Sequence, residues 1–137
     1  MQEHHFRLQF DEYSADFVLG GKHTLYDLAA FILKTIGFDF DHAFEFCNDI
    51  KRPYKSTERY TLFADIGQGD GEPGVKATQL EDVFRPKRAM VFHFDYGDDW
   101  MFLITCTAVK ESEAKRRFRR VLATTGKPPE QYPDCEE

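Results

Sequence analysis

The sequence predicts an α+β fold: a single domain in which a mixed or mostly antiparallel sheet packs against one main helix, with a second, C-terminal helix. Three observations favour this fold. Apolar and polar residues alternate along 6–10, as in a strand with one buried face; an amphipathic stripe follows over 24–36; and two apolar segments, 89–94 and 100–109, flank a short turn. A grasp-like arrangement, with the helix lying across the sheet, is compatible with this order of elements.

The main helix is predicted over residues 24–36. Thr24 is a suitable N-cap, and Asp27 completes a capping box while placing a negative charge at the helix N-terminus. Gly37 suits the left-handed conformation that ends many helices. The apolar stripe that must face a core consists of Leu25, Leu28, Ala29, Ile32 and Ile36.

Shorter elements surround this helix. Residues 6–10 and 15–19 predict a hairpin, and 60–63 a strand or strand fragment. The segment 65–74 holds four of the nine glycines and is predicted to be a mobile loop. Residues 78–84 are predicted to form one helical turn.

Two strands and a helix are predicted toward the C-terminus. Segments 89–94 and 100–109 have the strongest strand character, and 95–99 supplies Gly-Asp chemistry for a tight hairpin turn. Ser112 is then the predicted N-cap of a final helix that extends to about Thr124 and is ended by a glycine two residues later.

The bulk composition excludes several classes of protein. Its 18 Lys and Arg against 24 Asp and Glu give a net charge of −6, which disfavours general adhesion to nucleic acid or anionic membranes. No apolar run approaches the roughly 20 residues that span a bilayer, and the N-terminus lacks the apolar core of a secretory signal. The three cysteines show no Cys-x-x-Cys spacing, so neither a disulfide framework nor a zinc site is expected. We therefore expect a cytoplasmic protein without a membrane partner, with one domain over 1–126 and a tail over 127–137.

The densest polar cluster lies between the last two predicted strands. His93 and Asp95 share one face of a strand because side chains alternate, and Asp98 and Asp99 follow in the turn before Trp100. Carboxylates beside an imidazole suit Mg²⁺, Mn²⁺ or Ca²⁺, so Asp95, Asp98 and Asp99 are candidate metal ligands. The competing interpretation is structural: Asp and Gly build the turn while the neighbouring rings pack beside it.

A second candidate is the segment from His42 to Phe46. On a strand His42 and Glu45 point to opposite faces, so they need not cooperate. A histidine held by a neighbouring carboxylate or carbonyl is more common than a metal ligand or a general base. The full candidate pocket consists of His42, Glu45, His93, Asp95, Asp98, Asp99 and Trp100.

A basic stretch occupies residues 110–120, with six cations against two acids. A helix with such a face is typical of phosphate contact, which makes Arg116, Arg117 and Arg120 candidates for nucleic-acid binding. The alternative is that these charges form the solvated side of the helix and complement its dipole.

Three segments carry a family resemblance. The first is the helix motif over 24–39, followed by His-Ala-Phe-Glu-Phe at 42–46. The second and most specific is Phe-Asp-Tyr-Gly-Asp-Asp-Trp at 94–100, and the third is Lys-Pro-Pro-Glu at 127–130. In this order they resemble the plasmid pRiA4b ORF-3-like family. The resemblance implies a small α+β fold, and some members carry a label that ties them to mobile elements, but it implies no activity that transfers to these residues.

The chain also departs from the family pattern. Ala29 stands where members usually have a His, and Met101 and Phe102 replace an acid and a His after the signature Trp. Residues 131–135 replace the usual Asp-Cys-Gly-Gly. If the family's extra histidines form a polar site, the resemblance implies that this chain has lost much of it.

Three functions remain open at this level. The first choice is a non-catalytic binding or interaction module without a cofactor, associated with plasmids or other mobile elements, whose partner is a protein or a small molecule. The alternative is a small divalent-metal-dependent enzyme acting on a phosphate or nucleotide, with Asp95, Asp98 and Asp99 as ligands and His93 or His42 as base. The third is nucleic-acid binding through the C-terminal basic helix.

Overall fold

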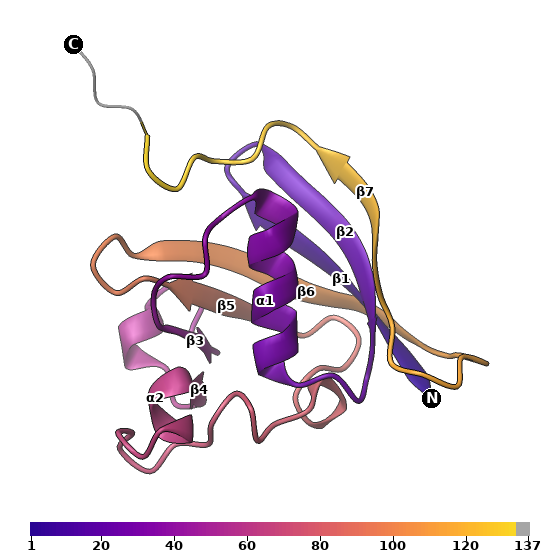
Figure 1. Ribbon diagram of the computed structural model, residues 1–137, viewed down its shortest axis with the longest axis horizontal. Coiled ribbons are helices and arrows are strands. Elements are labelled where there is room, and N and C mark those ends of the chain that lie inside the picture. Colours follow the sequence, from indigo (N-terminus) through magenta and orange to yellow (C-terminus); the bar gives the residue numbers. More distant parts are fainter. Residues whose placement is uncertain (134–137) are drawn as a thin grey trace.

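One antiparallel seven-stranded sheet with helix α1 across one face dominates the computed structural model, which describes residues 1–133 (Figure 1). The strand order is β4-β3-β5-β6-β1-β2-β7. The strands are β1 (Gln2–Phe10), β2 (Tyr13–Gly20), β3 (Phe44–Cys47), β4 (Arg59–Thr61), β5 (Ala89–Phe94), β6 (Trp100–Glu111) and β7 (Arg119–Thr125). The helices are α1 (Leu25–Ile36) and α2 (Leu62–Asp65), with 3₁₀ turns η1 (Pro53–Lys55) and η2 (Leu80–Asp82). None of the helices within residues 1–133 has the length and apolar character that crossing a membrane requires.

The predicted main helix is confirmed together with its caps. The Thr24 hydroxyl accepts a hydrogen bond from the backbone N–H of Asp27 at 3.1 Å, and the Asp27 carboxylate accepts one from the backbone N–H of Thr24 at 3.0 Å. Gly37 ends the helix at φ 82°. This capping box satisfies two backbone donors that would otherwise have no partner in the first turn.

Both predicted hairpins are also confirmed. β1 pairs with β2 so that Phe6 lies opposite Phe17, and β5 pairs with β6 so that Phe92 lies opposite Phe102. Because side chains alternate along each strand, these rings point to the same face as α1.

Phenylalanine fills most of the space between the sheet and α1. The Phe92 ring centroid lies 5.6 Å from that of Phe44 and 5.1 Å from that of Phe46, which are ordinary distances for packed aromatic pairs. The fully buried rings are Phe6, Phe17, Phe44, Phe46, Phe92, Phe94 and Phe102. Seven of the 14 phenylalanines are therefore fully buried core residues.

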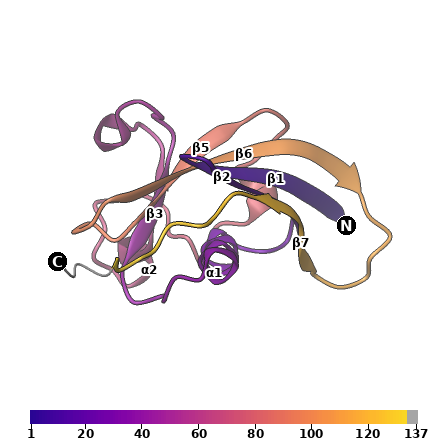
Figure 2. The same ribbon diagram turned by 90° about the horizontal axis from the view of Figure 1, so that it is seen from above.

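The opposite face of the sheet has a different cover. Glu45 and Cys47 alternate with the core rings along β3, so their side chains point away from α1. Figure 2 shows that the connection between β3 and β4, which contains η1, lies on the side of the sheet opposite α1. This connection brings polar residues from 48–58 over β3 and β5.

The predicted C-terminal helix over 112–124 is wrong. β6 continues to Glu111, and β7 (Arg119–Thr125) pairs antiparallel with β2. The helical periodicity was misleading because the run from Val121 to Thr125 is rich in β-branched residues and the edge of β2 offers backbone partners. Tertiary strand pairing here outweighs local helix propensity.

The predicted tail is ordered in its first part. The Gln131 side chain brackets Asp39: its Oε1 accepts from the Asp39 backbone N–H at 2.6 Å, and its Nε2 donates to the Asp39 carbonyl at 3.1 Å. The Tyr132 hydroxyl donates to the Asp41 carboxylate at 2.7 Å. Residues 127–133 are thus held against the chain that leaves α1, whereas 134–137, including Cys135, lie outside the described residues.

Candidate functional site

Four of the site residues lie in one chain of ion pairs on the sheet face away from α1. Glu45 of β3 lies directly opposite His93 of β5. The Glu45 carboxylate accepts from Arg59 Nη1 at 2.7 Å and from His93 Nδ1 at 2.9 Å. His93 Nε2 donates to Asp99 Oδ1 at 2.7 Å, and the Tyr54 hydroxyl donates to the same oxygen at 2.9 Å. We call Arg59, Glu45, His93 and Asp99 the ion-pair chain.

The contacts of His93 favour the protonated form of its ring. Its side chain is fully buried, and each ring nitrogen faces a carboxylate oxygen, which only accepts hydrogen bonds. Burial alone would lower the pKa of His93, but the hydrogen bonds with Glu45 and Asp99 outweigh burial and raise it. Burial likewise opposes ionisation of Glu45, yet His93 and Arg59 hold its pKa below the ordinary value.

Both ring nitrogens of His93 and both carboxylate oxygens of Glu45 are engaged within the ion-pair chain. A general base needs a lone pair directed at its substrate, whereas both nitrogens of His93 donate to carboxylate oxygens. Both oxygens of Glu45 are likewise engaged, by Arg59 and by His93. The ion-pair chain therefore fixes the positions of these charged side chains on the sheet face.

A polar pocket of about 440 Å³ adjoins the ion-pair chain. The rings of Phe63 and Tyr96 stack with centroids 5.7 Å apart at one side of it. Glu72 accepts hydrogen bonds from the Thr61 hydroxyl and the Asp70 backbone N–H, both at 2.6 Å, and these bonds lower its pKa. We call this the Tyr96 pocket; its lining includes Glu45, Arg59, Thr61, Phe63, Glu72 and Tyr96.

The predicted residues His42, Asp95 and Asp98 form a second group at the end of β5. His42 Nδ1 lies 2.7 Å from Asp41 Oδ1 and 3.5 Å from Asp95 Oδ2. The hydrogen bond with Asp41, together with the charges of Asp95 and Asp98, raises the pKa of His42. Asp95 is buried, at φ 67°, and its Oδ1 accepts from the backbone N–H groups of Gly97 and Asp98. Asp95 thus builds the turn, as the structural interpretation expected.

Asp99 belongs to the ion-pair chain instead, so the candidate metal ligands Asp95 and Asp99 bind different partners. Its carboxylate binds His93 and Tyr54, whereas Asp95 binds backbone N–H groups and approaches His42. Within residues 1–133, no three His, Cys, Asp or Glu side chains are grouped so that they could hold a metal ion.

Trp100 is partly buried and packs against the core. Its ring packs 5.5 Å from Phe10 and 4.9 Å from Phe38, on the α1 face of the sheet. Its indole N–H is buried without a hydrogen-bond partner.

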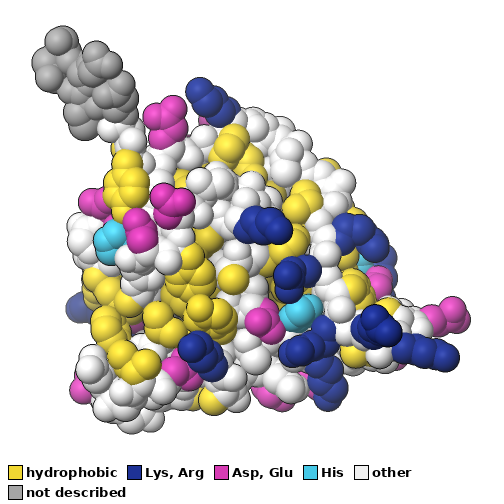
Figure 3. Space-filling model, in the orientation of Figure 1, with side chains coloured by type: hydrophobic (Ala, Val, Ile, Leu, Met, Phe, Trp, Pro, Cys, Tyr) yellow, Lys and Arg dark blue, Asp and Glu magenta, His cyan; other side chains and the backbone are white. Residues whose placement is uncertain are grey.

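The three candidate nucleic-acid residues lie on the surface at the other end of the sheet. Arg116 and Arg117 precede β7, and Arg120 lies within it; all three are exposed. Figure 3 shows Lys and Arg side chains gathered on the right half of this face, where Figure 1 places β2 and β7. Arg120 therefore lies on an edge strand and Arg116 and Arg117 in the connection before it, and not on the predicted helix.

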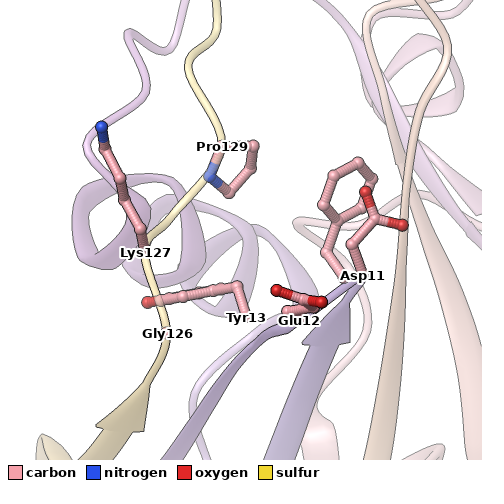
Figure 4. Close-up of a pocket in the computed structure, with 7 residues that line it drawn as sticks. Asp11, Glu12, Tyr13, Gly126, Lys127 and Pro129 are labelled. Carbon is pink, nitrogen blue, oxygen red and sulfur yellow. The ribbon is translucent and has the colours of Figure 1, made fainter.

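A second cavity, of about 550 Å³, lies where the C-terminal segment passes the β1–β2 turn (Figure 4). Asp11 and Glu12 line one side, and Gly126, Lys127 and Pro129 line the other. Gly126 has φ +82°, and a Cβ on it would lie 2.5 Å from the carbonyl oxygen of Glu12. The glycine is what permits this close approach.

Gly126→Ala is expected to destabilise the protein more than Gly37→Ala does. Both glycines have φ +82°, so each substitution costs about 1 kcal/mol in backbone strain. At Gly37 the added Cβ meets no atom within 4 Å, whereas at Gly126 the Glu12 backbone must also move. Urea unfolding of the two variants measures the difference; equal losses would contradict the packing at Gly126.

The family assignment follows from a comparison of the whole chain with known families. The family described as plasmid pRiA4b ORF-3-like protein matches residues 12–136. The chain belongs to this family. None of the curated proteins compared with the chain matches it.

A solved structure shares the fold of this plasmid pRiA4b ORF-3-like protein. It is the crystal structure of a protein of unknown function from Methanosarcina mazei Go1, with a TM-score of 0.74 and 16% sequence identity. The similarity covers 93% of this chain and 71% of that chain. At this identity the comparison shows the architecture alone.

In this family member, sequence reasoning missed two residues of the ion-pair chain and its surroundings. Tyr54 lies in the polar segment before β4 and Arg59 is the first residue of β4, and this stretch has no periodicity that places it over the sheet. One signal was available: Glu45 lies between Phe44 and Phe46, and a carboxylate in an aromatic strand requires a cationic partner. This pattern predicts that Glu45 has a cationic partner, but it does not identify the residue.

Proposed function

We propose that the protein is a non-catalytic binding module whose ligand site is the Tyr96 pocket and whose ligand carries a positive charge. The observation that supports this most directly is the combination of the stacked Phe63 and Tyr96 rings with carboxylates in one pocket. Aromatic faces and carboxylates both attract cations.

The charge balance of the Tyr96 pocket supports the proposal that its ligand is positively charged. Glu45, Asp70 and Glu72 line it against one cation, Arg59. Glu45 is already neutralised by Arg59 and His93, which leaves Asp70 and Glu72 to face an incoming group. A ligand of opposite charge is attracted to such a surface, and an anion is repelled.

The ion-pair chain supports binding rather than turnover. Arg59 and Glu45 belong both to the chain and to the pocket wall, so the wall is fixed before a ligand arrives. Such preorganisation reduces the ordering cost of binding. The metal-dependent alternative would need Asp95, Asp98 and Asp99 to converge, but the side chains of Asp95 and Asp99 have separate partners. The description of the family names a plasmid, which supports the further proposal that the module is associated with mobile elements. We also propose that it acts in the cytoplasm.

Choline, spermidine and L-argininamide are suitable cationic probes. Thermal unfolding is measured with each probe, because a ligand that binds the folded state raises the melting temperature. The uncharged analogue of choline, 3,3-dimethyl-1-butanol, is expected to leave the melting temperature unchanged. Failure of all three cations to stabilise the protein or to give heat in titration calorimetry would contradict the proposal.

Phe63→Leu is expected to weaken cation binding about fivefold because it removes one aromatic face. Phe40→Leu is the matched control: Phe40 is 38% exposed against 37% for Phe63, but it packs beside Tyr26 on the α1 side. Equal affinities of the two variants in titration calorimetry would place the ligand elsewhere.

A further inference from the structure

The two edge strands of the sheet, β4 and β7, differ in whether their outer backbone groups have hydrogen-bond partners. At β4 the neighbouring loop covers the edge: the backbone N–H of Thr61 donates to the Pro73 carbonyl, and that of Val75 donates to the Thr61 carbonyl, both at 3.2 Å. At the opposite edge, β7 pairs with β2 and, within residues 1–133, with no other strand. The outer edge of β7 therefore presents backbone donors and acceptors to solvent.

β7 also has the surface of a docking strand. All seven of its residues are exposed, including Val121 at 41% and Leu122 at 47%. Such an edge takes an added strand through main-chain hydrogen bonds, while alternate side chains supply apolar contact.

The positive charge around β7 restricts which kind of segment can pair with this strand. Residues 114–125 contain five cations and no acid. Arg117 lies 4.0 Å from Asp27, and it is the only one of the five with an ion pair among the described residues. The cations are Lys115, Arg116, Arg117, Arg119 and Arg120.

We propose that β7 is a docking site for an extended acidic peptide segment of a partner protein, which adds to the sheet as a further strand. Its backbone pairs with the free edge of β7, its acidic side chains meet the arginines, and its apolar side chains cover Val121 and Leu122. This surface lies at the sheet edge opposite the Tyr96 pocket, so it serves a second partner.

A peptide fits this edge better than nucleic acid does. Phosphates accept hydrogen bonds but have no backbone N–H to give to the carbonyls of an open strand, whereas a peptide supplies both. The net charge of −6 also repels a polyanion at long range, while a short acidic segment senses mainly the local cations.

The test uses the full chain and a fluorescein-labelled peptide of alternating glutamate and valine, followed by fluorescence anisotropy at low salt. We expect this peptide to bind about tenfold more tightly than its lysine–valine counterpart. The double variant Arg119→Gln/Arg120→Gln is expected to weaken binding about fivefold. The matched control is Lys51→Gln/Lys55→Gln, which removes the same charge from the exposed β3–β4 connection and is expected to leave binding unchanged.

Backbone pairing is separated from simple charge attraction by a glutamate–valine peptide that is N-methylated at alternate residues. This peptide keeps its charge but loses donors along one edge, and we expect it not to bind. Equal binding of the methylated peptide, or absence of binding by the parent peptide, overturns the proposal. If a length-matched oligothymidylate binds more tightly than the peptide, the surface belongs to nucleic acid. If sedimentation shows a dimer that Leu122→Lys breaks, the surface belongs to a second copy of this chain. Either result also overturns the proposal.

Discussion

Phe92→Ala is expected to lower the free energy of unfolding by about 3–5 kcal/mol. The Phe92 ring is fully buried on β5 and packs against Phe44, Phe46 and Phe102. Its partners belong to strands on both sides of β5, so neither neighbour alone can collapse into the space left by the ring. Urea unfolding followed by far-UV circular dichroism measures the loss.

Phe63→Ala is the control for this substitution. Phe63 is 37% exposed and stacks on Tyr96 outside the core, so its removal is expected to cost about 1 kcal/mol or less. A loss at Phe92 no larger than that at Phe63 would show that the aromatic layer tolerates a cavity and does not stabilise the fold as its packing indicates.

Local signals explain what the sequence predicted well. Thr24 and Asp27 specify the start of α1 and Gly37 its end, each through contacts within a few residues, and the two hairpins join neighbouring segments. The prediction at β7 failed because its outcome depends on the free edge of β2, which lies about a hundred residues earlier in the chain. Periodicity within 112–124 contains no information on that edge.

The candidate site was predicted in part for the same reason. Strand alternation places His93 correctly on the face away from the core, but it fails at Asp95, because β5 ends at Phe94 and the backbone of Asp95 is left-handed. Asp95 therefore turns toward His42, and His93 is left to pair with Glu45 across the sheet. Register between distant strands decides which polar residues meet, and a single sequence does not specify it.

His93→Gln is expected to destabilise the protein by about 3 kcal/mol near neutral pH. The substitution keeps much of the side-chain volume but removes the positive charge between two carboxylates, so the buried Glu45 is left with Arg59 as its single cationic partner. In Glu45→Gln/His93→Gln the buried charge is also removed, and the loss is expected to be smaller than the sum of the two single losses. Additive losses would contradict direct coupling of these side chains.

The stability difference between wild type and His93→Gln is expected to depend on pH. The pKa of His93 is raised above its ordinary value of 6.5, so its contribution is fully present below that pH and is lost as the pH rises through the folded-state pKa. The pKa of Glu45 is lowered from 4.5, so its contribution is present above that value and is lost as the pH falls through the folded-state pKa. Both contributions are present between pH 4.5 and pH 6.5. The stability difference between wild type and His93→Gln is therefore largest in this range and smaller in alkaline solution. Urea unfolding of both proteins at about pH 5.5 and about pH 9 measures it, and a difference that stays constant would mean that the buried imidazole is neutral and that the ion-pair chain does not carry its charge.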